Sequence, residues 1–294
     1  MATMKNYVLT QSTTVRRFGI VLGGIVSLFM TGCVFQNFGD SQFHLQMAAH
    51  GKDVMWIPTK VEMAHEMLSL AGIKSEDVVY DLGSGDGVIP IEASKKYGVR
   101  AVGIEYNSDL VELSKRNAKR AGMDALASFR RGDIFVEDFS EATVLTLYLG
   151  ESLNARLMPK ILKMKPGTRI VSNTFRMESW IPDREIRLAS GEQAYLWVVP
   201  ANIDGRWNFS GFRDGNTAQV TLRQKKQYLD ASTTWENRGR AFVSEGKIQG
   251  SEIHFELASR DNKILTFYGV ADGDLISGSL QDDPSIKIIG HRVR

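Results

Sequence analysis

The chain has 294 residues, of which 43% are hydrophobic and 24% are charged, as in an ordinary folded protein of one or two domains. Its 36 basic and 34 acidic residues leave a formal net charge of +2, which gives no ground for nucleic acid as the main partner. The sequence has one cysteine, Cys33, which excludes an intrachain disulfide.

Basic residues precede a short apolar stretch near the N-terminus. Lys5, Arg16 and Arg17 are followed by an uncharged run over residues 18–32 and then by Cys33. Because the run is shorter than the roughly 20 apolar residues of a membrane-spanning helix, it is typical of an export signal.

The end of this run, Met30-Thr31-Gly32-Cys33, resembles the lipobox of bacterial lipoproteins. The resemblance implies a signal peptide over residues 1–33 that ends in lipidation of Cys33. It also implies a membrane-anchored, exported protein whose residues 34–52 form a tether. An uncleaved anchor that leaves the chain facing the cytosol is the alternative.

The hydrophobic pattern after the tether alternates between helical and extended periods. Strands are predicted over residues Val78–Leu82, 101–105, 127–130, 143–149 and Arg169–Asn173, and helices over residues 59–72, 88–96, 108–121 and 153–164. Pro159 is expected to kink or shorten the last helix. This alternation predicts an α/β fold, a parallel sheet with helices on both faces. Residues 185–188 and 194–199 are predicted to add an antiparallel edge pair, joined through Gly191.

After Pro200 the helical periods end and short alternating segments recur, at residues 220–222, 226–228, 253–257, 264–267 and 286–289. A faint repeat aligns residues 246–253 with residues 269–276, and its paired glycines are typical of hairpin turns. The C-terminal part is therefore predicted to be an all-β antiparallel meander or small barrel. The predicted domains are residues 53–200 and 201–294.

A glycine-rich turn, Asp81-Leu82-Gly83-Ser84-Gly85-Asp86-Gly87, joins the first predicted strand to a helix. Glycines at alternate positions allow a sharp turn and a close approach of the backbone to a ligand. The dinucleotide-binding spacing G-x-G-x-x-G would need a glycine at Val88. The motif instead resembles motif I of the class I, Rossmann-like S-adenosylmethionine-dependent methyltransferases. That resemblance implies that the loop wraps the methionine part of S-adenosylmethionine and that Asp81 faces its positive end.

Acidic residues also follow the next two predicted strands. Glu105 lies 22 residues after Gly83, where an acid can accept hydrogen bonds from a ribose, and Tyr106 is placed to lie against an adenine. Asp133 and Ile134 match the family position that contacts the adenine. Each acid alone has an ordinary alternative as a strand end or a turn cap. Three acids at successive strand ends beside this loop indicate a cofactor site.

Several segments narrow the resemblance. Trp56-Ile57-Pro58-Thr59, DVVYDLGSGDG, ATVLTLYL and KPGTRIVSNTF are similar to a bacterial methyltransferase group related to the lysine methyltransferases of the ATP synthase c subunit. The similarity covers residues 53–200 and implies that Trp56 and Thr59 contact the cofactor. Thr59 also has the spacing of a helix N-cap.

The acceptor side is marked less clearly. Tyr148, after the fourth strand, and Asn173 and Trp180, after the fifth, are the candidates for catalytic or acceptor-lining roles, with packing as the alternative. No Asn/Asp-Pro-Pro-Tyr motif is present, so the pattern of amide and nucleobase N-methylation is missing. The five histidines have no metal-ligand spacing, so no metal is predicted.

These features together predict methyl transfer from S-adenosylmethionine by direct in-line displacement. The family resemblance makes a protein lysine the first expected acceptor, and a small-molecule amine or hydroxyl stays open. The expected partners are the acceptor and, through the N-terminus, a membrane, whereas nucleic acid is not expected. Because S-adenosylmethionine is made in the cytosol, export argues for an alternative: a membrane-tethered, non-catalytic binding lipoprotein.

Overall fold

The computed structural model describes residues 35–36, 40–41, 45–46, 53, 55–235, 240–259 and 263–294. The predicted signal peptide and Cys33 lie outside these residues and stay predictions. A short antiparallel pair, β1 (Phe35–Gln36) and β2 (Leu45–Gln46), begins the described part. In that part of the chain, no helix has both the length and the apolar character needed to cross a membrane.

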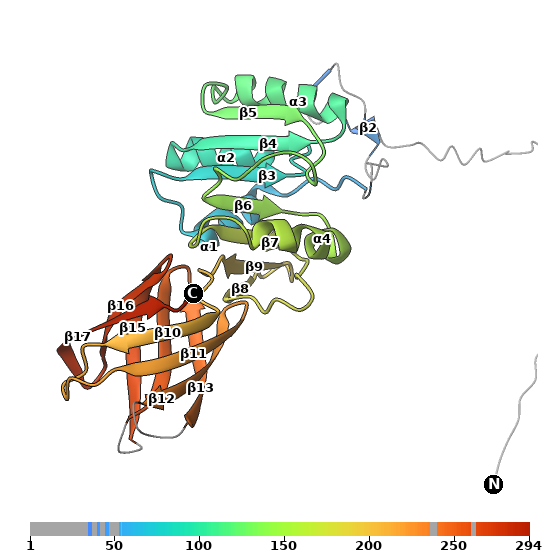
Figure 1. The fold of residues 1–294 in the computed structure, drawn as a ribbon. Helices are drawn as coiled ribbons and strands as arrows, with labels where there is room; N and C mark the ends of the chain where they lie inside the picture. The colour runs from blue at the N-terminus through green and yellow to red at the C-terminus, as the bar shows by residue number, and fades with distance from the viewer. Residues whose placement is uncertain are drawn as a thin grey trace, which may run out of the picture. The chain divides into compact units, whose positions relative to one another are not determined.

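A seven-stranded sheet forms the centre of the N-terminal half (Figure 1). Its strands are β3 (Val78–Leu82), β4 (Arg100–Glu105), β5 (Ala127–Arg131), β6 (Val144–Leu147), β7 (Arg169–Asn173), β8 (Arg184–Arg187) and β9 (Gln193–Val198). The order is β5-β4-β3-β6-β7-β9-β8, in which the first five are parallel and β9 and β8 are antiparallel additions. The predicted parallel sheet with an antiparallel edge pair is confirmed.

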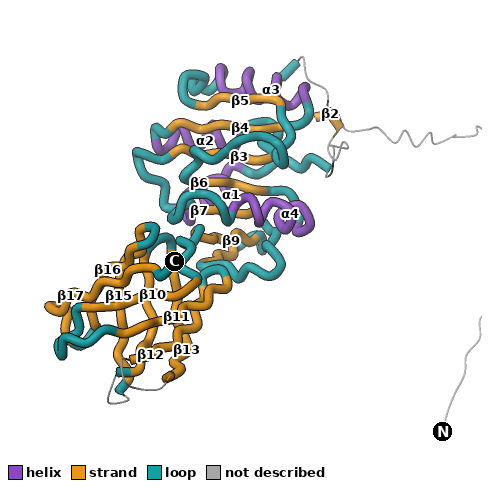
Figure 2. Tube along the Cα trace, viewed as in Figure 1, coloured by secondary structure: helices purple, strands orange, loops and turns teal. Residues whose placement is uncertain are grey.

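Four helices cover this sheet, namely α1 (Val61–Ala71), α2 (Val88–Tyr97), α3 (Ser108–Arg120) and α4 (Glu151–Ile161), drawn in purple in Figure 2. Successive strand residues alternate between the two faces. Val79 packs in the core with Met67 of α1, whereas Leu82 packs in a second core with Leu157 of α4. Helices therefore lie on both faces, as the alternation predicts.

Two helix ends differ from the prediction. The N-cap of α1 is Lys60, in an extended conformation (φ −68°, ψ 145°) and without a side-chain cap, so the predicted capping role of Thr59 is wrong. Thr59, ahead of this cap, lines a pocket instead. Pro159 lies inside α4, which ends at Ile161 rather than at the predicted Met164.

The C-terminal part is a closed barrel of eight antiparallel strands, in which β10 pairs with β17. The strands are β10 (Gly205–Ser210), β11 (Ala218–Lys225), β12 (Tyr228–Trp235), β13 (Arg240–Gln249), β14 (Glu252–Ala258), β15 (Ile264–Asp272), β16 (Leu275–Leu280) and β17 (Asp283–Arg292). Aromatic side chains fill its interior, and the ring of Phe209 packs edge-on against Phe255 at 5.9 Å and against Phe267 at 5.6 Å. The predicted small barrel is confirmed.

The barrel corrects the strand prediction in detail. The repeat forms two hairpins with two-residue turns, Gly250-Ser251 and Gly273-Asp274, as predicted. The strand predicted at residues 226–228 is wrong, because Lys226 takes a left-handed conformation (φ 58°) in the turn before β12. Strands β10, β13 and β16 were not predicted. Of these, β10 also pairs with the distant strand β17, whereas β13 and β16 pair with their neighbours in sequence. The division into domains at residue 200 stays a prediction.

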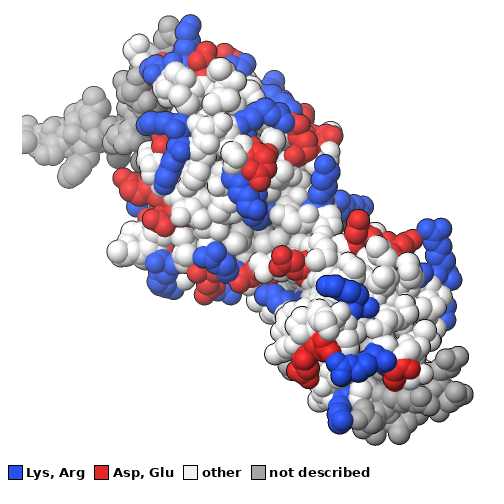
Figure 3. Space-filling view, turned by 90° about the vertical axis from the view of Figure 1, so that its left-hand side faces the viewer, with Lys and Arg blue, Asp and Glu red and all other residues white. Residues whose placement is uncertain are grey.

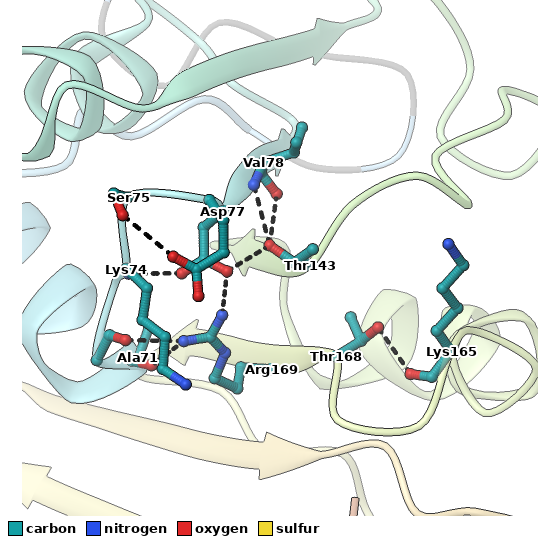
Figure 4. Close-up of polar contacts among 11 residues, drawn as sticks. Ala71, Lys74, Ser75, Asp77, Val78, Thr143, Lys165, Thr168 and Arg169 are labelled. Atoms are coloured by element: carbon teal, nitrogen blue, oxygen red, sulfur yellow. Dashed lines mark hydrogen bonds and ion pairs between the residues drawn. The ribbon is translucent and has the colours of Figure 1, made fainter. Parts of the chain in front are cut away.

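A buried carboxylate ties together the amino ends of the parallel strands (Figure 4). Asp77 accepts hydrogen bonds from the Lys74 N–H at 2.6 Å, from the Thr143 hydroxyl at 2.7 Å and from the Arg169 guanidinium. Arg169 also donates to the carbonyl of Ala71, at the end of α1, at 3.1 Å. The network therefore joins the ends of a helix and three strands.

Candidate functional site

A pocket of about 940 Å³, counting its open mouth, lies at the carboxyl ends of β3, β4, β5 and β6. In open α/β sheets this edge is where ligands bind. All the predicted cofactor residues except Gly87 line it: Trp56, Thr59, Asp81, Gly83, Ser84, Gly85, Asp86, Glu105, Tyr106, Asp133 and Ile134. The structure therefore brings the predicted positions to one place, and the contacts of each with a cofactor stay predictions.

The glycine loop uses its backbone donors inside the protein. The N–H groups of Gly83 and Ser84 donate to the carbonyl of Ile104 at 2.8 and 3.1 Å, and the Gly85 N–H donates to Glu105 Oε2 at 3.0 Å. These donors are not free to form the anion-binding nest that a phosphate needs. The loop is instead a close-fitting wall, which suits a ligand whose end at the loop is cationic.

Trp56 closes over this loop. A Cβ added to Gly85 would lie 2.2 Å from Trp56 Nε1, and Gly85 has a left-handed φ of +52°, so the close approach requires glycine. On its other side, Trp56 packs against Leu110 and Leu113 of α3. The segment ahead of α1 therefore covers the loop, and its predicted contact with the cofactor stays a prediction.

Among the described residues that line the pocket, the buried Asp81 and the partly buried Asp86 have no basic partner. Burial raises the pKa of Asp81 to about 7; a hydrogen bond from the Thr146 hydroxyl opposes the rise, and the charges of Glu105 and Asp86 add to it. Burial also raises the pKa of Asp86 to about 6, opposed by hydrogen bonds from backbone N–H groups. Because ionisation of these acids is unfavourable in the free protein, a cationic ligand is the favourable partner.

One buried hydroxyl among the described lining residues of the pocket is left without a partner. Ser84 is 5% exposed, and its Oγ has no hydrogen bond among the described residues. It lines the pocket next to Asp81 and Glu105. Buried polar groups are normally paired, so an unpaired hydroxyl here indicates a ligand contact. The set of carboxylate and hydroxyl groups fits the ribose and the cationic end of S-adenosylmethionine.

Glu105 holds the loop as well as lining the pocket. Its Oε1 accepts from the Asn107 N–H at 2.8 Å, and its Oε2 accepts from the Gly85 N–H. Glu105→Gln replaces one acceptor oxygen by a donor, so it is expected to lower the free energy of unfolding by about 1–3 kcal/mol. It should also weaken S-adenosylmethionine binding in calorimetry. Glu66→Gln, on the exposed side of α1, is the control; equal effects of both changes contradict the assignment.

Two residues that are predicted to contact the adenine, Asp133 and Tyr106, also have contacts with neighbouring residues of the chain. Asp133 Oδ1 accepts a hydrogen bond from the Phe135 N–H at 3.0 Å. One oxygen of this carboxylate therefore caps the turn, which was the alternative to a cofactor contact. Tyr106 is 44% exposed, and the guanidinium of Arg131 lies 5.9 Å from the centre of its ring. Both residues still line the pocket beside Ile134.

Of the three acceptor-side candidates, only Tyr148 is among the residues that line the pocket. Tyr148 lines the pocket, and its ring stacks on that of Phe175, with centres 5.9 Å apart and an interplanar angle of 29°. Asn173 is buried, accepts a hydrogen bond from the Thr174 hydroxyl at 2.9 Å and is not among the residues that line the pocket. Trp180 is fully buried against Trp197, which supports the packing alternative.

Three residues that act on Tyr148, namely Phe175, Glu192 and Lys60, were not predicted. Burial raises the pKa of the Tyr148 hydroxyl, the negative charge of Glu192 adds to the rise, and the positive charge of Lys60 opposes it. Phe175 follows a strand end, a position that could have been noted. Glu192 lies in the β8–β9 turn and Lys60 just before α1, and no local sequence pattern marks either.

Comparison with known proteins identifies the family. The family model described as the ANTKMT methyltransferase domain matches residues 81–184. A protein-lysine N-methyltransferase of Saccharolobus islandicus (strain REY15A) is 39% identical over 151 residues, which are 50% of this chain and 94% of that protein. The chain belongs to the S-adenosylmethionine-dependent methyltransferases. Its cofactor is S-adenosylmethionine, and the non-catalytic alternative is not favoured.

Other relatives of this methyltransferase differ in the acceptor that they name. A lysine N-methyltransferase of the ATP synthase c subunit, from Caenorhabditis elegans, is 28% identical over 145 residues, 48% of this chain and 74% of the relative. A crystal structure of an RNA methyltransferase from Salinibacter ruber, in complex with S-adenosyl-L-homocysteine, is 47% identical in sequence. It covers 50% of this chain and 96% of its own, with a TM-score of 0.49.

Proposed function

We propose that this methyltransferase transfers a methyl group from S-adenosylmethionine to the side-chain amine of a protein lysine. The charge of the pocket carries the proposal. Five carboxylates line it and, among the described lining residues, no lysine or arginine does. The acids are Asp53, Asp81, Asp86, Glu105 and Asp133. Such a field attracts a cationic amine and repels a polyanion.

The face drawn in Figure 3 supports the same class of acceptor. On the face drawn in Figure 3, basic and acidic side chains of the described residues are interspersed, without a continuous basic surface. Polyanionic acceptors such as RNA are bound mainly through such basic surfaces. The names of the relatives from S. islandicus and C. elegans, both lysine N-methyltransferases, agree with the proposal.

The residues of the pocket have separable tasks in this reaction. When bound, S-adenosylmethionine supplies a methyl group activated by a sulfonium. Asp81 balances positive charge beside the glycine loop, and Trp56 covers that loop and excludes water. Tyr148, which lines the pocket and stacks on Phe175, gives the acceptor amine an apolar wall. Because a desolvated amine is favoured in its neutral form, this wall helps it to release its proton to solvent before it reacts.

Transfer of a labelled methyl group tests the proposal. The full-length chain is incubated with S-adenosylmethionine labelled in its methyl group and with separate protein and RNA fractions of a bacterial lysate. After hydrolysis, the label is expected in N-methyllysine from the protein fraction, and it should be lost with Asp81→Asn. Label recovered in nucleosides, or in another amino acid, would overturn the lysine acceptor.

A further inference from the structure

A lysine of this chain is held by a carboxylate near the edge of the pocket. Lys60 Nζ lies 3.0 Å from Glu192 Oε2. Lys60 directly follows Thr59, which lines the pocket, and Glu192 directly precedes β9, whose first residues pair with the carboxyl end of β7. Both charges act on the hydroxyl of Tyr148. The ion pair therefore lies on the acceptor side of the site.

The backbone beside Glu192 is held in an unusual conformation. Thr174 has a left-handed φ of 63°, which is rare for a β-branched residue. Its N–H donates to the carbonyl of Gln193 at 2.7 Å, and Asn154 Nδ2 donates to the carbonyl of Phe175 at 3.2 Å. These bonds fix the end of β7 against the start of β9 and hold Phe175 in its stack with Tyr148. Such strain is typical of functional sites.

An aromatic pair beside a carboxylate is suited to the side chain of a lysine. The aromatic rings pack against the methylene groups and attract the positive end, and the carboxylate accepts its hydrogen bonds. The carboxylate has a partner of that kind here, because Lys60 supplies an ammonium group of the same chemistry as the acceptor.

We infer that Glu192 binds the ammonium group of the acceptor lysine, and that Lys60 occupies the same carboxylate until the acceptor replaces it. This inference rests on the proposed function. An incoming lysine can displace Lys60 from Glu192, because the side chain of Lys60 is 64% exposed and that of Glu192 is 31% exposed. Exposed ion pairs of this kind are weak and are readily displaced.

Glu192 is a positioning residue in this scheme. A carboxylate stabilises the charged form of an amine, so it assists capture of the acceptor and not the release of its proton. Its loss should therefore raise KM for the acceptor and leave kcat nearly unchanged. Glu192 Oε2 also accepts a hydrogen bond from the Ser190 hydroxyl at 2.8 Å, which closes its turn. A purely structural role would lower stability without this effect on KM.

Methylation of poly-L-lysine with labelled S-adenosylmethionine tests the inference in the full-length chain. Glu192→Gln is expected to raise KM for poly-L-lysine about tenfold, and Glu192→Asp should restore part of the loss. Lys60→Met removes the internal competitor and is expected to lower KM by up to about fivefold. The matched controls are Glu112→Gln and Lys115→Met, which break an exposed ion pair of 2.8 Å on α3.

Two binding measurements separate the possible outcomes. Calorimetry should show unchanged S-adenosylmethionine affinity in every variant, and weaker poly-L-lysine binding by Glu192→Gln loaded with S-adenosyl-L-homocysteine. If Glu192→Gln keeps the wild-type KM, or lowers cofactor affinity and melting temperature instead, the inference is overturned and lysine methylation stands. If the wild type binds the cofactor but never methylates poly-L-lysine, the proposed function and the inference both fail.

Discussion

Asp81→Asn is expected to weaken S-adenosylmethionine binding at about pH 8 by roughly 100-fold, as loss of one partner of a buried charge pair does. Asp81 is 4% exposed and lies at the end of β3, where it accepts a hydrogen bond from the Thr146 hydroxyl at 2.7 Å. Asparagine keeps the size of the side chain and removes its charge. Calorimetric titration of the full-length chain measures the change.

The same carboxyl makes cofactor affinity depend on pH. With a pKa of about 7, Asp81 becomes protonated as the pH falls below neutral. The affinity of the wild type is then expected to fall by up to about tenfold per pH unit below pH 7. Asp81→Asn should lose this part of the dependence and keep a weaker one from Asp86, whose pKa is about 6. Equal wild-type affinity on both sides of neutrality would contradict the role of Asp81.

The stability of the free protein should change in the opposite direction. Because the pKa of Asp81 is raised in the folded state, its contribution to stability is present below its ordinary pKa of 3.8 and is lost as the pH rises through about 7. Asp81→Asn is therefore expected to raise the melting temperature of the cofactor-free protein above neutral pH. A variant that is more stable and yet binds less cofactor is the mark of a functional residue.

Asp77→Ala is expected to lower the free energy of unfolding by about 3–5 kcal/mol, because it leaves a buried guanidinium without its carboxylate. The side chains of Asp77 and Arg169 are 4% and 16% exposed. The change also removes the acceptor of the Lys74 N–H and the Thr143 hydroxyl (Figure 4). A loss of this size is a large share of the roughly 5–15 kcal/mol that stabilise a folded protein.

Urea unfolding followed by circular dichroism measures this effect. The matched control is Asp274→Ala, which breaks the ion pairs of Asp274 with Arg292 at 3.0 Å and with Arg294 at 2.8 Å. Because the Asp274 side chain is 50% exposed, the control should lower the free energy of unfolding much less than Asp77→Ala does. Equal midpoints for the two variants would refute the structural role of the network. Cofactor affinity should survive Asp77→Ala under folding conditions, since Asp77 lies at the opposite edge of the sheet from the pocket.

The positions of the predicted cofactor residues could be derived from the sequence, because the lengths of the strands, loops and helices between them fix where each strand ends. Strands β3 and β4 are each followed by a short loop and a helix that returns to start the next parallel strand, so Asp81, Glu105 and Asp133 must come to the same sheet edge. The glycines of the loop are likewise a local requirement, since Gly85 needs both a left-handed φ and the absence of a Cβ beside Trp56.

Only the tertiary structure brought together the residues of the proposed acceptor side. Phe175 meets Tyr148 across two strands, and Glu192 reaches Lys60 over a separation of 132 residues. Such contacts depend on how an antiparallel hairpin pairs with β7, which no local period reveals. The prediction for Asn173 depended in the same way on local position. Asn173 lies at a strand end, but it is not among the residues that line the pocket.

The sequence by itself determined the α/β alternation, the convergence of the predicted cofactor residues at one sheet edge and the all-β character of the C-terminal part. These features depend on periods and turn residues within short segments. The tertiary structure decided where helix α1 begins, how the barrel closes and which charges meet near the pocket. The pairing of β10 with β17 joins residues 207–210 to residues 289–292. Its stability comes from burying Trp207 and Phe209 in a closed core, an energy that exists only after the distant strands have met.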